Sequence, residues 1–145
     1  MQQTLSKSEI GETFATGAKV ITEADEEAFC AITENNLPMF LSDAAARAKG
    51  WEKRIVPGVF TFSVAIGLME SSGLLDDVVA FLGTDDLRFV KAAYIGDTIH
   101  VEVELKDKKF SKGGSRGTVH YEWRALNQHR QDIVRGTNTC MFKVG

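Results

Sequence analysis

The segment from Gly58 to Gly73 constrains the fold more than any other part of this chain, because it reads as a helix without a polar side. Pro57 stands where such a helix would begin, since the first turn of a helix tolerates proline. Apolar side chains follow on nearly every face: Val59, Phe60, Phe62, Val64, Ala65, Ile66, Leu68 and Met69. A helix that is apolar nearly all round is a buried helix. We therefore expect the chain, 145 residues long, to form one domain around a central helix.

The second half of the chain has the two-residue period of β-strands. Apolar and polar residues alternate over residues 99–106, 118–125 and 134–144. This pattern is typical of antiparallel strands with one face on a core and the other in solvent. Lys112–Ser115 and Asn127–Arg130 are rich in turn-forming residues and would connect these three strands.

Two further strands complete the predicted sheet. One covers Val78 to Phe89 with a bend or interruption at Gly83–Asp86, and the other lies early, from Thr13 to Thr22. The elements predict an α+β fold, a single hot-dog domain in which an antiparallel five-stranded sheet wraps around one buried central helix. This domain would span residues 1–145, with residues 1–10 loosely ordered.

A sheet of this size leaves an edge strand and part of the helix uncovered. We therefore expect a dimer, formed either by two copies of the chain or with another hot-dog subunit.

Two short helices are predicted before the central one. Thr22 and Asp25 have the form of a capping box, which predicts a helix to about Thr33. The apolar face of this helix would consist of Ala24, Ala28, Phe29 and Ile32. Ser42 or Asp43 can cap a second, alanine-rich helix.

Composition and charge exclude several classes of partner. A net charge of -3 argues against nucleic acid and anionic membrane surfaces, which attract strongly basic domains. The most apolar stretch, Ile55–Met69, is shorter than the roughly 20 residues of a membrane span, and no secretory signal precedes it. Cys30 and Cys140 read as buried thiols in a reducing compartment. We therefore expect a cytoplasmic protein, and no histidine and cysteine spacing indicates a metal site.

Six short motifs occur in an order and spacing that identify a family. They are Gly11–Phe14, Thr22–Ala31, Ser42–Asp43, Arg54–Gly58, Tyr94–Thr98 and Asn127–Gln128. With these motifs the chain resembles the MaoC-like dehydratases, relatives of the (R)-specific enoyl-CoA hydratases. The resemblance implies a hot-dog fold and the activity of a lyase. It also implies that the protein binds an acyl-CoA or acyl-carrier thioester as substrate or ligand and needs no other cofactor.

The loop after the first helix departs from that family. There an aspartate and a histidine jointly hold the water that adds to the double bond, and the resemblance puts Asn35 and Phe40 in their places. An amide cannot take a proton at neutral pH, and a phenyl ring can neither hold nor shuttle one. Pro38 keeps the loop in register, and Gly58 remains where a backbone N–H would polarise the thioester carbonyl. The resemblance therefore implies a binding pocket without its base.

The same resemblance gives the residues that would contact the thioester. Gly58 and Pro57 would do so at the start of the central helix, and Pro38, Met39 and Phe40 at the loop.

Glu34 and Asn35 are the candidates for replacement chemistry. A one-residue slip of the loop would present the Glu34 carboxylate to the pocket, where apolar surroundings would raise its pKa. The alternative interpretation is a solvent-facing residue at the end of a helix. Asn35 could orient a water or a carbonyl oxygen without acting as a base. Glu70 is a candidate catalytic carboxylate or an exposed residue at a helix end, and Cys30 is a candidate nucleophile or a buried inert thiol.

A basic cluster surrounds one predicted hairpin of this acidic chain. Lys109, Lys112 and Arg116, with Lys106 and Lys108 beside them, would contact the phosphates of coenzyme A or of a carrier-protein arm. The alternative is a solvated hairpin whose lysines discourage aggregation.

Three functional hypotheses remain open, and whether the chain is an enzyme is uncertain. The first is an acyl-thioester binding protein without hydratase activity, such as a non-catalytic subunit of a hydratase. The second is a divergent hydratase, isomerase or thioesterase that uses Glu34, Asn35 or an ordered water. The third is a binding module for some other small molecule.

Overall fold

A computed structural model describes residues 3–144. Its elements, in chain order, are a short 3-10 helix η1 (Leu5–Lys7), β1 (Thr13–Ala15), β2 (Lys19–Val20), α1 (Glu23–Thr33), α2 (Pro38–Leu41), α3 (Asp43–Ala48), α4 (Gly58–Ser71), β3 (Val78–Phe89), β4 (Thr98–Phe110), β5 (Arg116–Leu126) and β6 (Asp132–Lys143). No helix among these residues is long and apolar enough to span a membrane.

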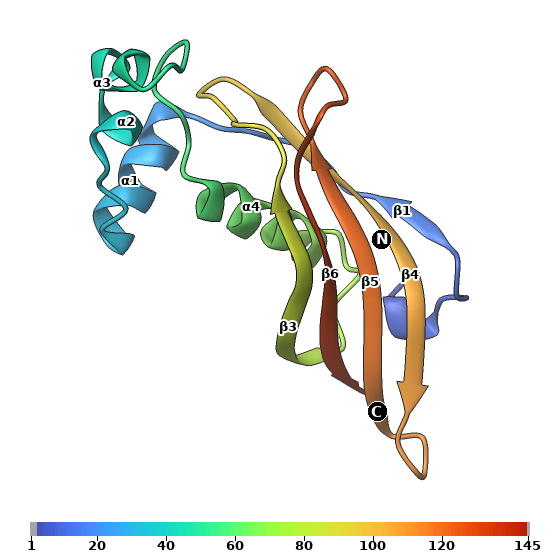
Figure 1. Cartoon of the computed structure of the whole chain (residues 1–145). Coiled ribbons are helices and arrows are strands. Elements are labelled where there is room, and N and C mark those ends of the chain that lie inside the picture. Colours follow the sequence, from blue (N-terminus) through green and yellow to red (C-terminus); the bar gives the residue numbers. More distant parts are fainter. Residues whose placement is uncertain (1–2, 145) are drawn as a thin grey trace.

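The sheet is antiparallel and is covered on one face by α4 (Figure 1). Its strand order is β1-β4-β5-β6-β3, and the two-residue β2 also pairs with β4. The sheet has six strands where five were predicted, because the early strand is split into β1 and β2. The predicted bend in the Val78–Phe89 strand is confirmed, since β3 shifts its register against β6 three times.

The alternation in the last three strands places its apolar members in the core, as predicted. Tyr121, Trp123 and Phe142 are almost fully buried and face α4. The Phe62 ring of α4 stacks on Trp123 with 5.7 Å between ring centroids. Ala65 and Met69, one and two turns further along α4, have no exposed surface. The apolar pattern of α4 therefore predicted its place correctly, although Val59 remains 45% exposed in the single chain.

The turn before β4 is held by side chains from two parts of the chain. Asp97 Oδ2 accepts a hydrogen bond from Tyr94 N at 2.9 Å, and Gly96 has a φ of 94°, which suits glycine. Gln128 Nε2 in turn donates to Asp97 Oδ1 at 2.9 Å, and its Oε1 accepts from Thr98 N at 3.0 Å. This turn and the β5–β6 turn therefore support each other.

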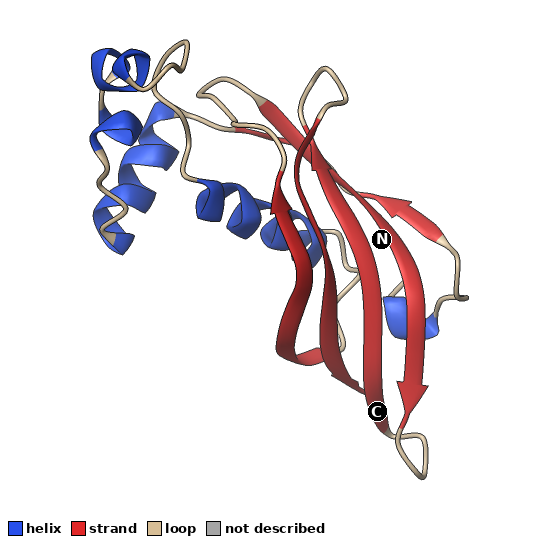
Figure 2. Ribbon diagram, in the orientation of Figure 1, coloured by secondary structure: helices blue, strands red, loops and turns tan. Residues whose placement is uncertain are grey.

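Helices α1, α2 and α3 form a lobe beyond the end of the sheet (Figure 2). The lobe reaches the central helix through the Phe29 and Phe60 rings, which meet edge-on at 5.0 Å. The capping box of α1 is confirmed, because Thr22 Oγ1 accepts from Asp25 N and the Asp25 carboxylate accepts from Thr22 N. The Ser42 cap of α3 is also present, since its hydroxyl accepts from Ala45 N at 3.2 Å.

The predicted apolar face of α1 was wrong in part. Ile32 is 82% exposed, whereas Glu26 and Cys30 are buried. The pattern failed because the lobe packs against residues on the other side of α1, which the spacing within one helix does not reveal.

The expectation that residues 1–10 are loosely ordered is also wrong where the structure describes them; residues 1–2 lie outside the described part. Leu5 is 1% exposed, and its N–H donates to Leu74 O at 2.9 Å. Lys108 Nζ donates to Ser8 O at 2.5 Å, and Ser6 donates to the Asp77 carboxylate. The segment is part of the core because its partners come from β4 and from the α4–β3 connection.

Replacing Leu5 by alanine should therefore lower the free energy of unfolding by about 2–5 kcal/mol, the usual cost of emptying a buried leucine site. Chemical denaturation of the purified protein measures this change. Ile10→Ala is the matched control, because Ile10 is 57% exposed. Equal effects of the two substitutions would contradict the packing of this segment.

Candidate functional site

The loop that follows α1 ends the helix in a conformation that turns its polar side chains outward. Glu34 has a φ of 62° at the C-cap, and its side chain is exposed. Asn35 Nδ2 donates to Thr33 Oγ1 at 2.7 Å, and that hydroxyl donates to Phe29 O at 2.6 Å. The amide of Asn35 is therefore engaged with the end of its own helix.

Phe40 lies in a small core of the lobe. Its side chain is 9% exposed and packs with Cys30 and Ile55. Pro38 begins α2, a place that suits a residue without an N–H. Met39 is half-buried, and its carbonyl accepts a hydrogen bond from Ile55 N at 3.2 Å.

That hydrogen bond links the loop to the start of α4. Pro57 is buried and caps the helix, and Gly58 is its first residue. The first N–H groups of a helix have no acceptor within it and carry partial positive charge. A Cβ added at Gly58 would lie 2.7 Å from the half-exposed Phe89 ring, so an alanine at this position would displace that ring. This hydrogen bond and the edge-on contact of Phe29 with Phe60 attach the lobe to the beginning of α4.

The predicted phosphate-binding residues lie elsewhere. Lys109, Lys112 and Arg116 are exposed around the β4–β5 hairpin, at the opposite end of the sheet from the α1–α3 lobe (Figure 1). One chain does not bring them to the loop. A contact with coenzyme A phosphates stays a prediction that requires a second chain.

The other candidates lie in ordinary structural settings. Glu70 is exposed at the end of α4. Cys30 is 1% exposed, and its burial raises the pKa of the thiol, with the Glu26 carboxylate adding to the rise. A raised pKa keeps the thiol protonated and weakly nucleophilic. Among residues 3–144, no three His, Cys, Asp or Glu side chains are grouped so that they could hold a metal ion.

Glu26 is the residue that the sequence analysis missed. It lies one turn before Cys30 on α1, is fully buried, and neither carboxylate oxygen has a hydrogen-bond partner among the described residues. Burial raises the pKa of Glu26 to about 7, an effect that Arg54 opposes and that Glu27 and Glu23 reinforce. In the sequence it is the middle of three consecutive acids, which reads as a solvated first turn.

The Arg54 side chain holds parts of the lobe together around the Glu26 carboxyl. Its guanidinium lies 3.1 Å from Glu23 Oε1 and 3.9 Å from Glu27 Oε1, and Nη1 donates to Leu41 O at 3.4 Å. Arg54 therefore joins α1 to α2 while Glu26 faces the interior.

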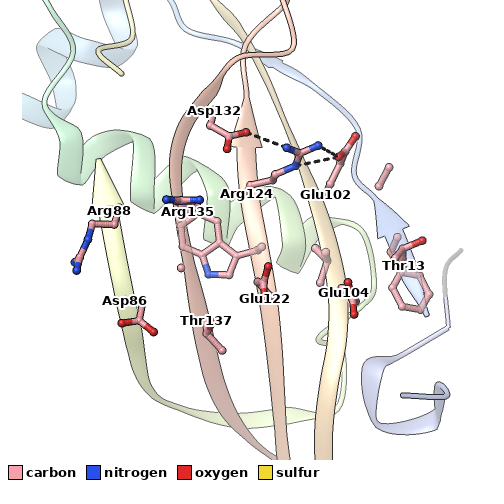
Figure 3. A pocket seen from close by; sticks show the side chains of 15 residues that line it. Thr13, Asp86, Arg88, Glu102, Glu104, Glu122, Arg124, Asp132, Arg135 and Thr137 are labelled. Atoms are coloured by element: carbon pink, nitrogen blue, oxygen red, sulfur yellow. Dashed lines mark hydrogen bonds and ion pairs between the residues drawn. The ribbon is translucent and has the colours of Figure 1, made fainter. Parts of the chain in front are cut away.

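One hollow of the described surface lies away from the loop. It measures about 980 Å³ and lies on the outer face of the sheet, opposite α4 (Figure 3). Arg124 crosses it with ion pairs of 3.0 Å to Glu102 and 3.3 Å to Asp132. A hydrogen bond from Arg130 lowers the pKa of Glu102, and one from Arg124 lowers it further. Balanced, paired charges of this kind are typical of a solvated sheet face, and the hollow contains none of the predicted site residues.

A family model and a related protein match this chain in sequence. The model described as "MaoC like domain" matches residues 6–125. Protein MaoC of Klebsiella aerogenes is 32% identical over 98 residues, which make up 68% of this chain and 29% of that protein. The chain therefore spans less than a third of the length of this relative.

Solved structures agree on the fold. The R-hydratase PhaJ1 of Pseudomonas aeruginosa superposes with a TM-score of 0.79 at 25% identity, over 98% of this chain and 86% of that one. A Mycobacterium tuberculosis protein described as having a double hotdog fold superposes with a TM-score of 0.83 at 21% identity, over 99% of this chain and 44% of that one. The predicted hot-dog fold is thereby confirmed.

Replacing Glu26 by leucine should stabilise the protein above neutral pH. The pKa of this carboxyl is about 7 in the folded chain, against an ordinary value of 4.5. The folded state therefore holds the proton more tightly, and stability falls as the pH rises from about 4.5 to about 7. At pH 8 this decrease in the free energy of unfolding is on the order of 3 kcal/mol, and the leucine variant should not show it.

Urea unfolding between pH 5 and 8 measures the difference between wild type and Glu26→Leu, which should grow with pH. Glu52→Gln provides the control and should follow the wild-type curve, because Glu52 is exposed and the charges that act on Glu26 come from Arg54, Glu27 and Glu23. Parallel curves for wild type and Glu26→Leu would show that Glu26 is charged and well solvated in the folded chain.

Proposed function

The chain belongs to the MaoC-like domain family, and from this we propose that it binds an acyl thioester, carried by coenzyme A or by a carrier protein, without hydrating it. The orthodox aspartate and histidine of the loop are replaced, while the helix start that would receive the thioester carbonyl is kept. The protein would then be a non-catalytic subunit of a hydratase, or a binder in its own right.

The start of α4 is the observation that carries this proposal. The N–H of Gly58 points out of the helix N-terminus, where partial positive charge favours a carbonyl oxygen. Glycine at this position lets another group approach the backbone closely, as the Phe89 ring already does. A thioester carbonyl placed there would be polarised whether or not a base is present.

The loop supports the proposal that the bound thioester is not hydrated. The Asn35 amide is tied to Thr33 and carries no basic group. The Phe40 ring, which the resemblance puts in the place of the histidine, is buried with Cys30 and Ile55. Neither side chain can take a proton from a water, which general base catalysis requires.

A second hot-dog subunit is part of the proposal. Among residues 3–144, strand β3 pairs with β6 alone and forms an edge of twelve residues. Large apolar side chains on and beside this edge are about half exposed: Val79, Phe81, Leu82, Phe89 and Val90. Long apolar edges favour pairing with another strand. The double hotdog protein of Mycobacterium tuberculosis, of which this chain matches less than half, supports a two-domain assembly.

Such an assembly gives the basic hairpin a role. Lys109, Lys112 and Arg116 cannot reach the loop of their own chain, but a partner's thioester could extend toward them. The partner would be a second copy of this chain or a subunit that supplies the missing aspartate and histidine.

Calorimetry and turnover test the proposal together. The purified protein should bind a saturated acyl-CoA and should hydrate crotonyl-CoA far more slowly than the roughly 1–1000 per second of typical enzymes. Gly58→Ala should weaken binding by about tenfold or more, because the added methyl clashes with Phe89 and blocks the approach to the N–H.

Gly67→Ala is the matched control, since a Cβ at this position of α4 meets no atom within 4 Å. Sedimentation of all three proteins verifies that the oligomer is unchanged. Enzyme-like turnover that Glu34→Gln or Asn35→Ala abolishes would establish the divergent enzyme instead. Failure to bind any acyl-CoA would leave the binding module for another small molecule.

A further inference from the structure

Four positively charged side chains around the β4–β5 hairpin have no ion-pair partner. They are Lys109 near the end of β4, Lys112 in the turn, Arg116 at the start of β5 and Lys143 at the end of β6. All four are exposed, and none forms a salt bridge with a residue between 3 and 144. We call these four side chains the hairpin cations.

The two lysines beside them are engaged within the chain. Lys106 Nζ lies 3.2 Å from Glu104 Oε2, and Lys108 Nζ donates a hydrogen bond to Ser8 O at 2.5 Å. The hairpin cations are therefore the part of this basic region that is left for a partner.

Two of the hairpin cations lie directly opposite each other. Arg116 of β5 is the register partner of Lys143 of β6, and like charges in this position repel. Protection of a sheet edge does not account for this pair, because β5 and β6 are interior strands with a neighbour on both sides. A repulsion that no ion pair of the described residues relieves favours an anionic partner.

A second hollow of the described surface, of about 290 Å³, lies among these charges and has a mostly apolar lining. Lys109, Arg116, Thr118 and Met141 border it, together with Phe110, which is 52% exposed. Thr118 is the register partner of both Lys109 and Met141, so these three side chains lie on the same face of the sheet. The hollow thus combines an apolar lining with cations at its rim.

This combination is complementary to the surface of an acidic protein. The net charge of the chain is -3 with the hairpin cations included, so the hairpin attracts an acidic partner that the remaining surface repels. An apolar side chain of that partner would occupy the hollow while carboxylates around it meet the cations. Lys109 and Lys143 are separated by β5, which puts their backbones about 10 Å apart. Charges spread this widely suit a protein face better than a single phosphate.

The place of the hairpin in an assembly connects it with the proposed thioester site. It lies at the opposite end of the sheet from the α1–α3 lobe of its own chain (Figure 1). Two subunits that pair symmetrically through β3 have antiparallel β3 strands. The lobe and the central helix start of one subunit then lie toward the hairpin end of the other.

We infer that the hairpin cations and the hollow between them dock an acidic carrier protein, whose acyl thioester enters the site of the second subunit. The inference rests on the proposed thioester binding at Gly58. It selects a carrier protein, in preference to free coenzyme A, as the carrier of the acyl group.

Calorimetry with one acyl group on three carriers tests the inference. The ligands are butyryl-pantetheine, butyryl-CoA and an acidic acyl carrier protein loaded with butyrate. At low salt, wild type should bind the loaded carrier protein about tenfold or more tightly than either small thioester. An ionic strength of about 1 M, at which the Debye length is about 3 Å, should remove most of this preference.

Arg116→Gln and Lys143→Gln are the test variants. Each should weaken binding of the loaded carrier protein by several fold, the double variant by about tenfold or more, and none should change binding of butyryl-pantetheine. Both single variants should unfold at the wild-type temperature or above it, because each removes a like-charge repulsion. Lys19→Gln is the matched control, since it removes one exposed charge from β2, which pairs with the opposite end of β4.

Each outcome decides a different claim. Equal binding of the three thioesters would overturn the inference and leave thioester binding intact. A preference for the carrier protein that survives in the double variant would place the docking surface elsewhere and also overturn it. Butyryl-CoA that binds as tightly as the carrier protein, and loses this advantage in the double variant, would assign the hairpin to phosphates instead. Failure of all three ligands to bind would reject the proposed function, and the inference with it.

Discussion

The packing of α4 against the sheet is the interaction on which the rest of this structure depends. Phe62 stacks on Trp123, while Ala65 and Met69 lose all of their exposed surface to the strands. Burial of each large apolar side chain contributes about 1.5–3 kcal/mol, so this contact supplies much of the stability that so small a domain can reach. It also fixes where the helix begins. The backbone N–H of Gly58, the Phe89 ring beside it and the lobe attached through Phe60 all take their positions from α4.

Elements whose pattern comes from one dominant contact were predictable from the sequence. The two-residue period of the last three strands predicted their buried side, because every second residue enters the core, while β4 continues to Phe110, four residues beyond the predicted pattern. The capping box of α1 and the Ser42 cap were predictable because capping involves residues three apart in the chain. Leu5 and Ile32 show where such reasoning ends. Leu5 is buried by Leu74 and its neighbours, and Ile32 is exposed because the lobe packs on the opposite side of α1.

In the candidate site, too, some residues were predicted from the sequence and others were not. Motif and spacing predict Gly58, Asn35 and Phe40 as site residues, and the structure adds what each one contacts. Glu26 could not be found, because its burial depends on Arg54 drawing α2 against α1.

The central claim is that the N-terminus of α4 binds the thioester carbonyl although the loop provides no general base. Carbon NMR of crotonyl-CoA labelled at the carbonyl tests this claim most directly. In the complex with wild-type protein, the account predicts that the carbonyl resonance moves in the direction of a stronger hydrogen bond, as donation from the Gly58 N–H requires. It also predicts that the spectrum stays that of the enoyl thioester over hours. An unshifted carbonyl in the bound ligand would show that the helix start does not receive it. The appearance of hydroxybutyryl-CoA at an enzymatic rate would show that the loop still activates water.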